Sequence, residues 1–245
     1  MIDVYKFSRY DKNRNVEFCP MDTRQLWDKN SKEYSDDKAI KYYQENPIEY
    51  SFNNYGFRTP DDFNHDDDGN IFLGCSHTFG IGHHLENTWS YKLNKFMGGK
   101  FWNLSQGGTG VDTAFRLLYG FKDYLNGKNI FHYAPTFHSY RYEFIIESEP
   151  RLMNILYDNG RHAKRFLGDR FVEESLADDR VAKLNYDKSI YAIESLSEEM
   201  GCNYYVLTES ILGDYKDDNS IKARDFTHHT IGEQTHIYDS FLNII

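Results

Sequence analysis

Cysteine is scarce in this chain, and long apolar runs are missing. The three cysteines, Cys19, Cys75 and Cys202, are far apart and show no C-x-x-C spacing, which argues against a disulfide framework or a structural zinc site. No apolar run reaches the about 18 residues that a membrane helix needs. The opening MIDVYKFSRYDKNRN has no apolar segment of the secretory kind. We therefore expect no membrane span, no signal peptide and a cytoplasmic location.

Clusters of basic residues are also missing. Lysine and arginine total 28 against 38 acidic residues, which gives a formal net charge of -10. Nucleic acids and anionic membranes attract proteins through positive charge. We expect neither as a partner, and the acidity serves solubility.

Aromatic residues are abundant, with 20 Tyr and 18 Phe among 245 residues. They supply much of the area that a core can bury. The length fits one α/β domain with a small extension. Residues 1–65 are polar and aromatic with few aliphatic runs, and we interpret them as an N-terminal extension packed on a domain at 66–245.

Strand and helix patterns alternate along the rest of the chain. Short apolar runs predict strands at 70–75, 100–104, 129–134 and 203–208. Helical spacing of apolar residues predicts helices at 86–97, 110–125, 186–200 and 231–245, and the charged stretch 137–183 is interpreted as a mostly helical insertion. This alternation implies a mainly parallel sheet with helices on both faces, whose site lies at the carboxyl ends of the strands.

Ser76 lies just after the first of these strands, in 72-FLGCSHTFGIG-82. A serine at a strand-to-helix turn can attack a carbonyl carbon, and its own N–H can help to bind the resulting oxyanion. The alternative is that Ser76 only caps the helix that follows. The segment is not the G-x-S-x-G elbow of α/β-hydrolases, because position 78 is Thr.

Asp225 and His228 are three residues apart, just before the C-terminal helix. On one loop the carboxylate can reach the imidazole, fix its tautomer and leave the other ring nitrogen to accept the serine proton. The alternative is that Asp225 is a helix cap and His228 a surface residue. Both segments are predicted at the same edge of the sheet.

These blocks together resemble the SGNH/GDSL hydrolase superfamily, as a divergent member. Its Gly-Asp-Ser-x-(Ser/Thr) block is matched by Gly74 to Thr78, its Asn and following oxyanion-hole Gly by Asn103 and Gly108, and its Asp-x-x-His by 225–228. The stretch 53-NNYGFRTPDDF-63 is similar to the N-G-F-R stretch that precedes the first block. The resemblance implies a three-layer α/β/α sandwich of the flavodoxin-like kind and a metal-independent ester or acyl hydrolysis.

The chain departs from the family pattern at two places. Cys75 replaces the usual Asp, and the Gly-x-Asn-Asp block is missing after the third strand, where the chain reads 132-HYAPTFHS-139. The family uses that Asn as an oxyanion donor, and losing one such donor costs about 10²–10³ in rate. Thr136 is the nearest side-chain donor, with His138 and Ser139 next; the alternative is that Thr136 only turns the chain after Pro135.

Other tempting features are discounted. The histidines in 77-HTFGIGHH-84 lack an H-E-x-x-H spacing, and 64-NHDDDGN-70 lacks the bidentate ligand of a calcium loop. We predict neither a metal nor a cofactor. Cys75 is interpreted as a small buried hydrophobe rather than a nucleophile.

Two functions from different classes follow. The first is a serine hydrolase for a small-molecule or carbohydrate ester, such as an acetylated sugar, in which Ser76 attacks, His228 moves the proton and Asp225 orients it. The N–H groups of Ser76 and Gly108 bind the oxyanion, with Thr136 as a third donor, while His77 and Arg141 contact the substrate. The second is a binding or structural module on the same fold with a decayed site.

Overall fold

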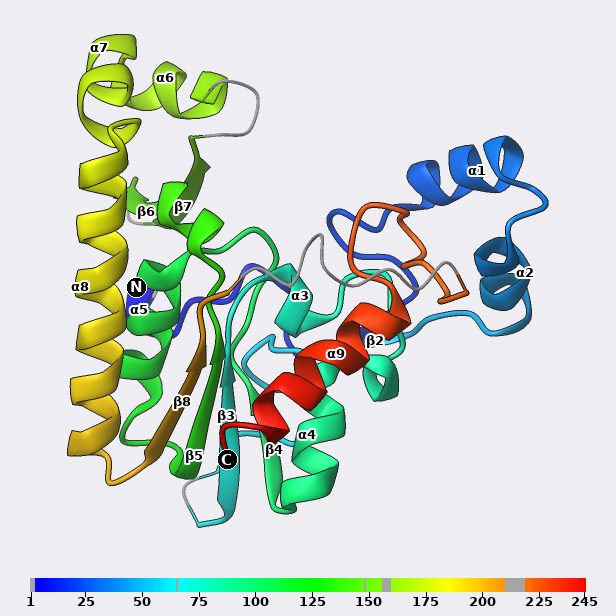
Figure 1. Ribbon diagram of the computed structural model, residues 1–245, viewed down its shortest axis with the longest axis horizontal. Helices are drawn as coiled ribbons and strands as arrows, with labels where there is room; N and C mark the ends of the chain where they lie inside the picture. Colours follow the sequence, from blue (N-terminus) through cyan, green and yellow to red (C-terminus); the bar gives the residue numbers. More distant parts are fainter. Residues whose placement is uncertain (1–2, 65, 148, 156–159, 210–218) are drawn as a thin grey trace.

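The computed structural model describes residues 3–64, 66–147, 149–155, 160–209 and 219–245 (Figure 1). At its centre lies a four-stranded parallel sheet with the strand order β4-β3-β5-β8. The strands are β3 (Asp68–Leu73), β4 (Lys100–Asn103), β5 (Asn126–Tyr133) and β8 (Asn203–Leu207). All four strand predictions are confirmed to within a few residues.

Helices cover both faces of this sheet, because side chains of a strand point alternately to opposite faces. Ile71 and Leu73 face α5 (Val111–Phe121) and α8 (Asp179–Glu199), in a core that includes Leu118. Phe72 faces the other way, toward α4 (Trp89–Met97) and α9 (Ile231–Leu242). Figure 1 shows the two helix layers on opposite sides of the strands. The predicted three-layer α/β/α sandwich is confirmed.

The N-terminal residues form a small hydrophobic core of their own, which packs against the segment that connects β3 to β4. They contain α1 (Arg24–Glu33), α2 (Lys38–Glu45) and an antiparallel pair, β1 (Arg14–Val16) and β2 (Tyr50–Phe52). Tyr50 and Phe52 pack with Phe79 and Ile81. In Figure 1, α1 and α2 lie at the far end of the molecule from α8. The domain boundary at residue 65 stays a prediction, since that residue is outside the described part.

The stretch 137–183 is helical in part, but it also contains a pair of strands that the sequence did not predict. A 3-10 turn at Thr136–Tyr140 leads into an antiparallel hairpin, β6 (Arg141–Ile146) and β7 (Glu149–Asn154). The helical parts are this 3-10 turn, α6 (Arg161–Leu167), α7 (Asp169–Phe171), a π-helical turn at Val172–Leu176 and the first residues of α8. Tyr142, Phe144 and Ile146 pack in one apolar cluster with Met153. This period of two is a strand pattern that was missed within a charged stretch of the sequence.

No helix in the described residues is long and apolar enough to cross a bilayer.

Candidate active site

Most of the predicted site residues come together at the carboxyl edge of the central sheet. The chain leaves β3 at Leu73 and enters α3 (Ser76–Phe79) at once, while the loop after β4 carries Gly108. A hollow of about 980 Å³ joins these loops to the loop before α9. We call it the Ser76 hollow; it is lined by Arg9, Met21, Ser76, His77, Gly107, Gly108, Phe137, Arg141, Leu152, Asn154, Thr227, His228, His229 and Glu233.

Gly74 sets the path of the chain into Ser76. Its φ is +145°, which L side chains rarely adopt, and a Cβ there would lie 2.2 Å from Thr78 Oγ1 and 2.9 Å from the carbonyl oxygen of Tyr133. Only glycine fits this turn without strain. The Thr109 hydroxyl donates to the Gly74 carbonyl at 3.1 Å, which ties the turn to the Gly108 loop.

Ser76 is 3% exposed and lines the hollow together with His228. Its hydroxyl lies 3.8 Å from Cys75 Sγ. Within the described residues it makes no hydrogen bond to His228. The structure therefore brings the predicted nucleophile and base into one hollow, with the serine hydroxyl turned toward its neighbour in sequence.

Asp225 and His228 form the pair that their spacing predicted. His228 Nδ1 lies 2.5 Å from Asp225 Oδ2, and the backbone N–H of His228 donates to Oδ1 at 3.3 Å. The Thr227 hydroxyl also donates to Oδ2. Burial alone would raise the pKa of Asp225, but the hydrogen bond and charge of His228 lower it below its ordinary value. Since Asp225 occupies Nδ1, Nε2 is the nitrogen that can take up a proton.

The N-terminal extension holds the loop that carries Asp225. Asn30 Nδ2 donates to the Asp225 carbonyl at 3.2 Å. The neighbouring Arg224 is buried and binds Asp22, with its Nε 3.1 Å from each carboxylate oxygen. The hydroxyl of Tyr50 donates to Asp22 at 2.5 Å and accepts from the Gly82 N–H at 2.8 Å. Sequence reasoning missed this support, because nothing in residues 1–65 marks which polar side chains are buried.

Further histidines surround the pair. The ring centroids of His77 and His229 are 3.8 Å apart. Burial, and next the neighbouring His229, lowers the pKa of His77 well below the usual imidazole range. Burial lowers the pKa of His83 to about 3. Both shifts favour the neutral imidazole at physiological pH. The described residues contain no group of three or more His, Cys, Asp or Glu side chains placed to hold a metal ion.

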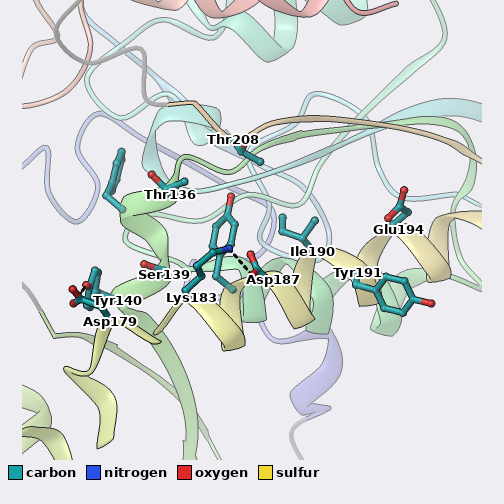
Figure 2. A pocket seen from close by; sticks show the side chains of 12 residues that line it. Thr136, Ser139, Tyr140, Asp179, Lys183, Asp187, Ile190, Tyr191, Glu194 and Thr208 are labelled. Atoms are coloured by element: carbon teal, nitrogen blue, oxygen red, sulfur yellow. Dashed lines mark hydrogen bonds and ion pairs between the residues drawn. The ribbon is translucent and has the colours of Figure 1, made fainter. Parts of the chain in front are cut away.

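Gly108 lines the Ser76 hollow, but Thr136 does not. Gly108 has a φ of +77°, and no atom lies within 4 Å of where its Cβ would be. Thr136 lines a second hollow of about 710 Å³ against α8, with Ser139 and Thr208 nearby (Figure 2). Phe137 borders both hollows. Because an oxyanion donor must reach the reacting carbonyl, this position does not support Thr136 as the third donor.

The same reason applies to the two substitutes for Thr136. His138 is buried beside Asp112 and Tyr186, and Ser139 lines the hollow against α8. Neither borders the Ser76 hollow. Both residues belong to the 3-10 turn that starts directly after Pro135.

Both predicted substrate-contacting residues, His77 and Arg141, line the Ser76 hollow. Arg9 and Met21 also line it, and sequence reasoning missed them because both belong to the extension. Leu152 and Asn154 come from β7, whose hairpin was unexpected.

The N-G-F-R stretch has a structural role. Arg58 is buried and donates to the carbonyl oxygens of Phe79, Gly80 and His83, at 3.0, 2.6 and 2.7 Å. The guanidinium thus satisfies carbonyl groups left free where α3 ends. Arg58 thereby holds residues 79–83, which follow Ser76, in place.

Comparisons with known proteins identify little beyond this geometry. No protein-family model matches the chain. A search of curated proteins likewise gives no match. Among solved structures, the fold is similar to an acetyl xylan esterase (Est2A) from the rumen bacterium Butyrivibrio proteoclasticus, with a TM-score of 0.33 and 12% identity over 74% of this chain. The chain spans 64% of the length of that esterase.

Proposed function

We propose that this chain is a metal-independent serine hydrolase that cleaves an ester or acyl bond of a small molecule or carbohydrate, such as an acetylated sugar. One observation carries the proposal: a buried carboxylate, Asp225, binds Nδ1 of His228 at 2.5 Å, and His228 borders the same hollow as Ser76. A buried carboxylate behind an imidazole beside a serine is the arrangement that activates a hydroxyl nucleophile.

The reaction proceeds in two halves. The Ser76 hydroxyl forms a bond to the substrate carbonyl carbon while His228 Nε2 accepts its proton. The tetrahedral intermediate collapses, the C–O bond to the leaving alcohol breaks, and His228 returns the proton to that alcohol. Water then attacks the acyl-serine with His228 again as base, which releases the acid and restores Ser76. Asp225 keeps its negative charge and stabilises the imidazolium in both halves.

The Ser76 hydroxyl must turn from Cys75 toward His228 for this reaction. Catalytic hydrogen bonds are often long or misaligned without substrate and tighten in the complex. A serine hydroxyl needs only a change of side-chain rotamer for such a turn.

Two backbone N–H groups, those of Ser76 and Gly108, serve as the oxyanion hole in this proposal. A site that lacks a third donor is slower by about 10²–10³ than one that has it. We therefore expect a low turnover number with simple esters. The open space at the Cβ position of Gly108 leaves the substrate free to approach this backbone.

The competing function is a non-catalytic binding module on the same fold. It is favoured by the contact of Ser76 with Cys75 rather than His228, and by the position of Thr136 outside the Ser76 hollow. Labelling with a fluorophosphonate probe separates the two functions. The hydrolase labels at Ser76, Ser76→Ala abolishes the label, and His228→Ala slows it strongly. A purified, folded protein that neither labels nor cleaves short p-nitrophenyl esters is a binding module.

The pH profile tests the role of His228 separately. Only a neutral imidazole accepts a proton, so kcat/KM should rise with pH between pH 5 and 8. Asp225, with its lowered pKa, stays charged over this whole range and contributes no step of its own. If chemistry limits the rate and the profile is flat over this range, His228 is not the base.

A further inference from the structure

Two guanidinium groups border the Ser76 hollow beside the proposed oxyanion donor. Arg9 NH1 donates to the Gly107 carbonyl at 2.9 Å, and Arg141 NH1 donates to the Thr109 carbonyl at 3.2 Å. The two arginines thus bind the loop on either side of Gly108, and they come from segments that are far apart in the sequence. A substrate whose carbonyl reaches Gly108 lies close to both positive charges.

Neither guanidinium is paired with a carboxylate in the described part of the chain. Their hydrogen-bond acceptors there are neutral carbonyl oxygens, and Nε of Arg141 is buried without a partner among the described residues. Each guanidinium has five N–H donors, so it can donate to a ligand in addition to its loop carbonyl. The chain as a whole has a net charge of -10, whereas these two side chains bring positive charge to the hollow.

The acidic groups of the hollow are already engaged. Glu233 accepts from the Thr230 N–H at 2.6 Å as part of the cap of α9, and it lies 3.6 Å from Nδ1 of His229. Asp225, behind His228, is bound by that imidazole and by Thr227. The remaining titratable lining residue on α3, His77, is a buried neutral imidazole. Neither carboxylate contacts Arg9 or Arg141 within the described residues. The charge of Glu143 acts on Arg9, but this carboxylate is itself paired with Arg116.

Arg141 is also held in place for binding. Its guanidinium carbon lies 5.2 Å from the ring centroid of Phe137, which borders the same hollow. A planar guanidinium fixed by one carbonyl and one aromatic ring loses little freedom when a ligand binds. Two N–H groups on one edge of the guanidinium can donate parallel hydrogen bonds to the two oxygens of a carboxylate.

We propose that the substrate of this site is an anionic ester, which carries a carboxylate within a few bonds of the scissile carbonyl, and that Arg9 and Arg141 bind that carboxylate. The proposal rests on the function proposed above for the ester bond, but its binding step is independent of catalysis. It makes the two arginines specificity-determining residues.

The kinetic test uses pairs of esters that differ only in the charge. Mono-4-nitrophenyl glutarate is compared with 4-nitrophenyl valerate for a carboxylate on the acyl side, and 4-acetoxybenzoate with its methyl ester for one on the alcohol side. Charge-assisted hydrogen bonds of this kind favour the anionic member of one pair by about 10- to 100-fold in kcat/KM. Both Arg9→Gln and Arg141→Gln should reduce this ratio. Arg24→Gln, which removes an exposed arginine outside the hollow, should leave it unchanged.

The ratio separates specificity from a purely structural role. If the arginines only hold the 107–109 loop, Arg9→Gln and Arg141→Gln slow both members of a pair alike, and the ratio stays as in the unmodified protein. That result overturns the proposal, as does a ratio near one in the unmodified protein.

A binding measurement keeps the inference testable if the protein cleaves no ester. Calorimetric titration of Ser76→Ala with glutarate and with neutral glutaramide should give at least tenfold tighter binding of glutarate, lost when Arg141→Gln is added. This result with no turnover and no probe label supports the anion site and overturns the hydrolase. Labelling at Ser76 with equal binding of both compounds supports the hydrolase and overturns the anion site.

Discussion

Replacing Asp22 by Asn tests whether the N-terminal extension holds the loop that carries Asp225. Asp22 and Arg224 are only 1% and 2% exposed in their side chains, and the pair connects residues on opposite ends of the chain. The change Asp22→Asn keeps the shape and removes the negative charge. It leaves the Arg224 guanidinium buried with only the Glu17 carbonyl and an amide as acceptors.

The size of the effect follows from the burial. Removing one partner of a buried ion pair costs about 3–5 kcal/mol, because the remaining charge has no counter-ion. A domain of this size loses about 2–4 °C in Tm per kcal/mol, so Tm should fall by about 6–20 °C. Because Asp225 follows Arg224 directly, kcat should fall as well, while KM changes little.

Differential scanning calorimetry and ester turnover measure the two effects. The matched control is Glu17→Gln, which breaks the exposed pair of Glu17 with Arg24 at 2.7 Å and should cost no more than about 1 kcal/mol. Asp22→Leu combined with Arg224→Met removes both charges and should recover much of the lost stability. If Asp22→Asn melts within about 2 °C of the unmodified protein, the pair does not stabilise this loop.

Three further predictions concern single positions. Gly74→Ala places a Cβ 2.2 Å from Thr78 Oγ1 and should lower the free energy of unfolding, measured with urea, by about 2–5 kcal/mol. The control is Gly98→Ala, where φ is also positive but no atom lies within 4 Å of the new Cβ. It should cost only about 1–2 kcal/mol. The pKa of Glu233 is lowered to about 2, where burial alone would raise it, by the nearby His229 and by the hydrogen bond from the Thr230 N–H. The charged carboxylate therefore stabilises the fold fully above its ordinary pKa, and this stabilisation is lost as the pH falls toward 2. Glu233→Gln should lower the free energy of unfolding by about 1 kcal/mol at pH 7 and by less at pH 3. A loss that is the same at both pH values contradicts this. Thr227→Val removes a hydroxyl that donates to the Asp225 carboxylate and should lower kcat about tenfold, whereas an unchanged kcat would show that the other donors suffice.

The sequence predicted the sheet and the positions of the two loops that carry Ser76 and His228 well, because each rests on local signals. Apolar runs of four to six residues mark β3, β4, β5 and β8, and the three-residue spacing of Asp225 and His228 is a property of one loop. Parallel strands bring their carboxyl ends to one edge, so Ser76 and His228 had to approach each other once the sheet was right.

The sequence could not predict contacts between distant segments. Arg9 and Met21 reach the Ser76 hollow only through the fold of the extension, and a lone arginine in a polar segment looks like any solvated residue. Thr136 follows the third strand as expected, yet the turn after Pro135 places it in the other hollow. The direction in which a side chain points after a proline depends on tertiary contacts, and the spacing of residues in a short motif does not determine it.

The Asp22–Arg224 pair also orders events during synthesis. Its partners are 202 positions apart, and Asn30 is separated from Asp225 by 195. At about 5–20 residues per second, the ribosome delivers the second partner about 10–40 s after the first. Throughout that interval Asp22 and Phe18 lack their partner Arg224, and Tyr34 lacks its partner Phe226. The nascent chain is thus without its Asp225–His228 pair until this stretch has been synthesised.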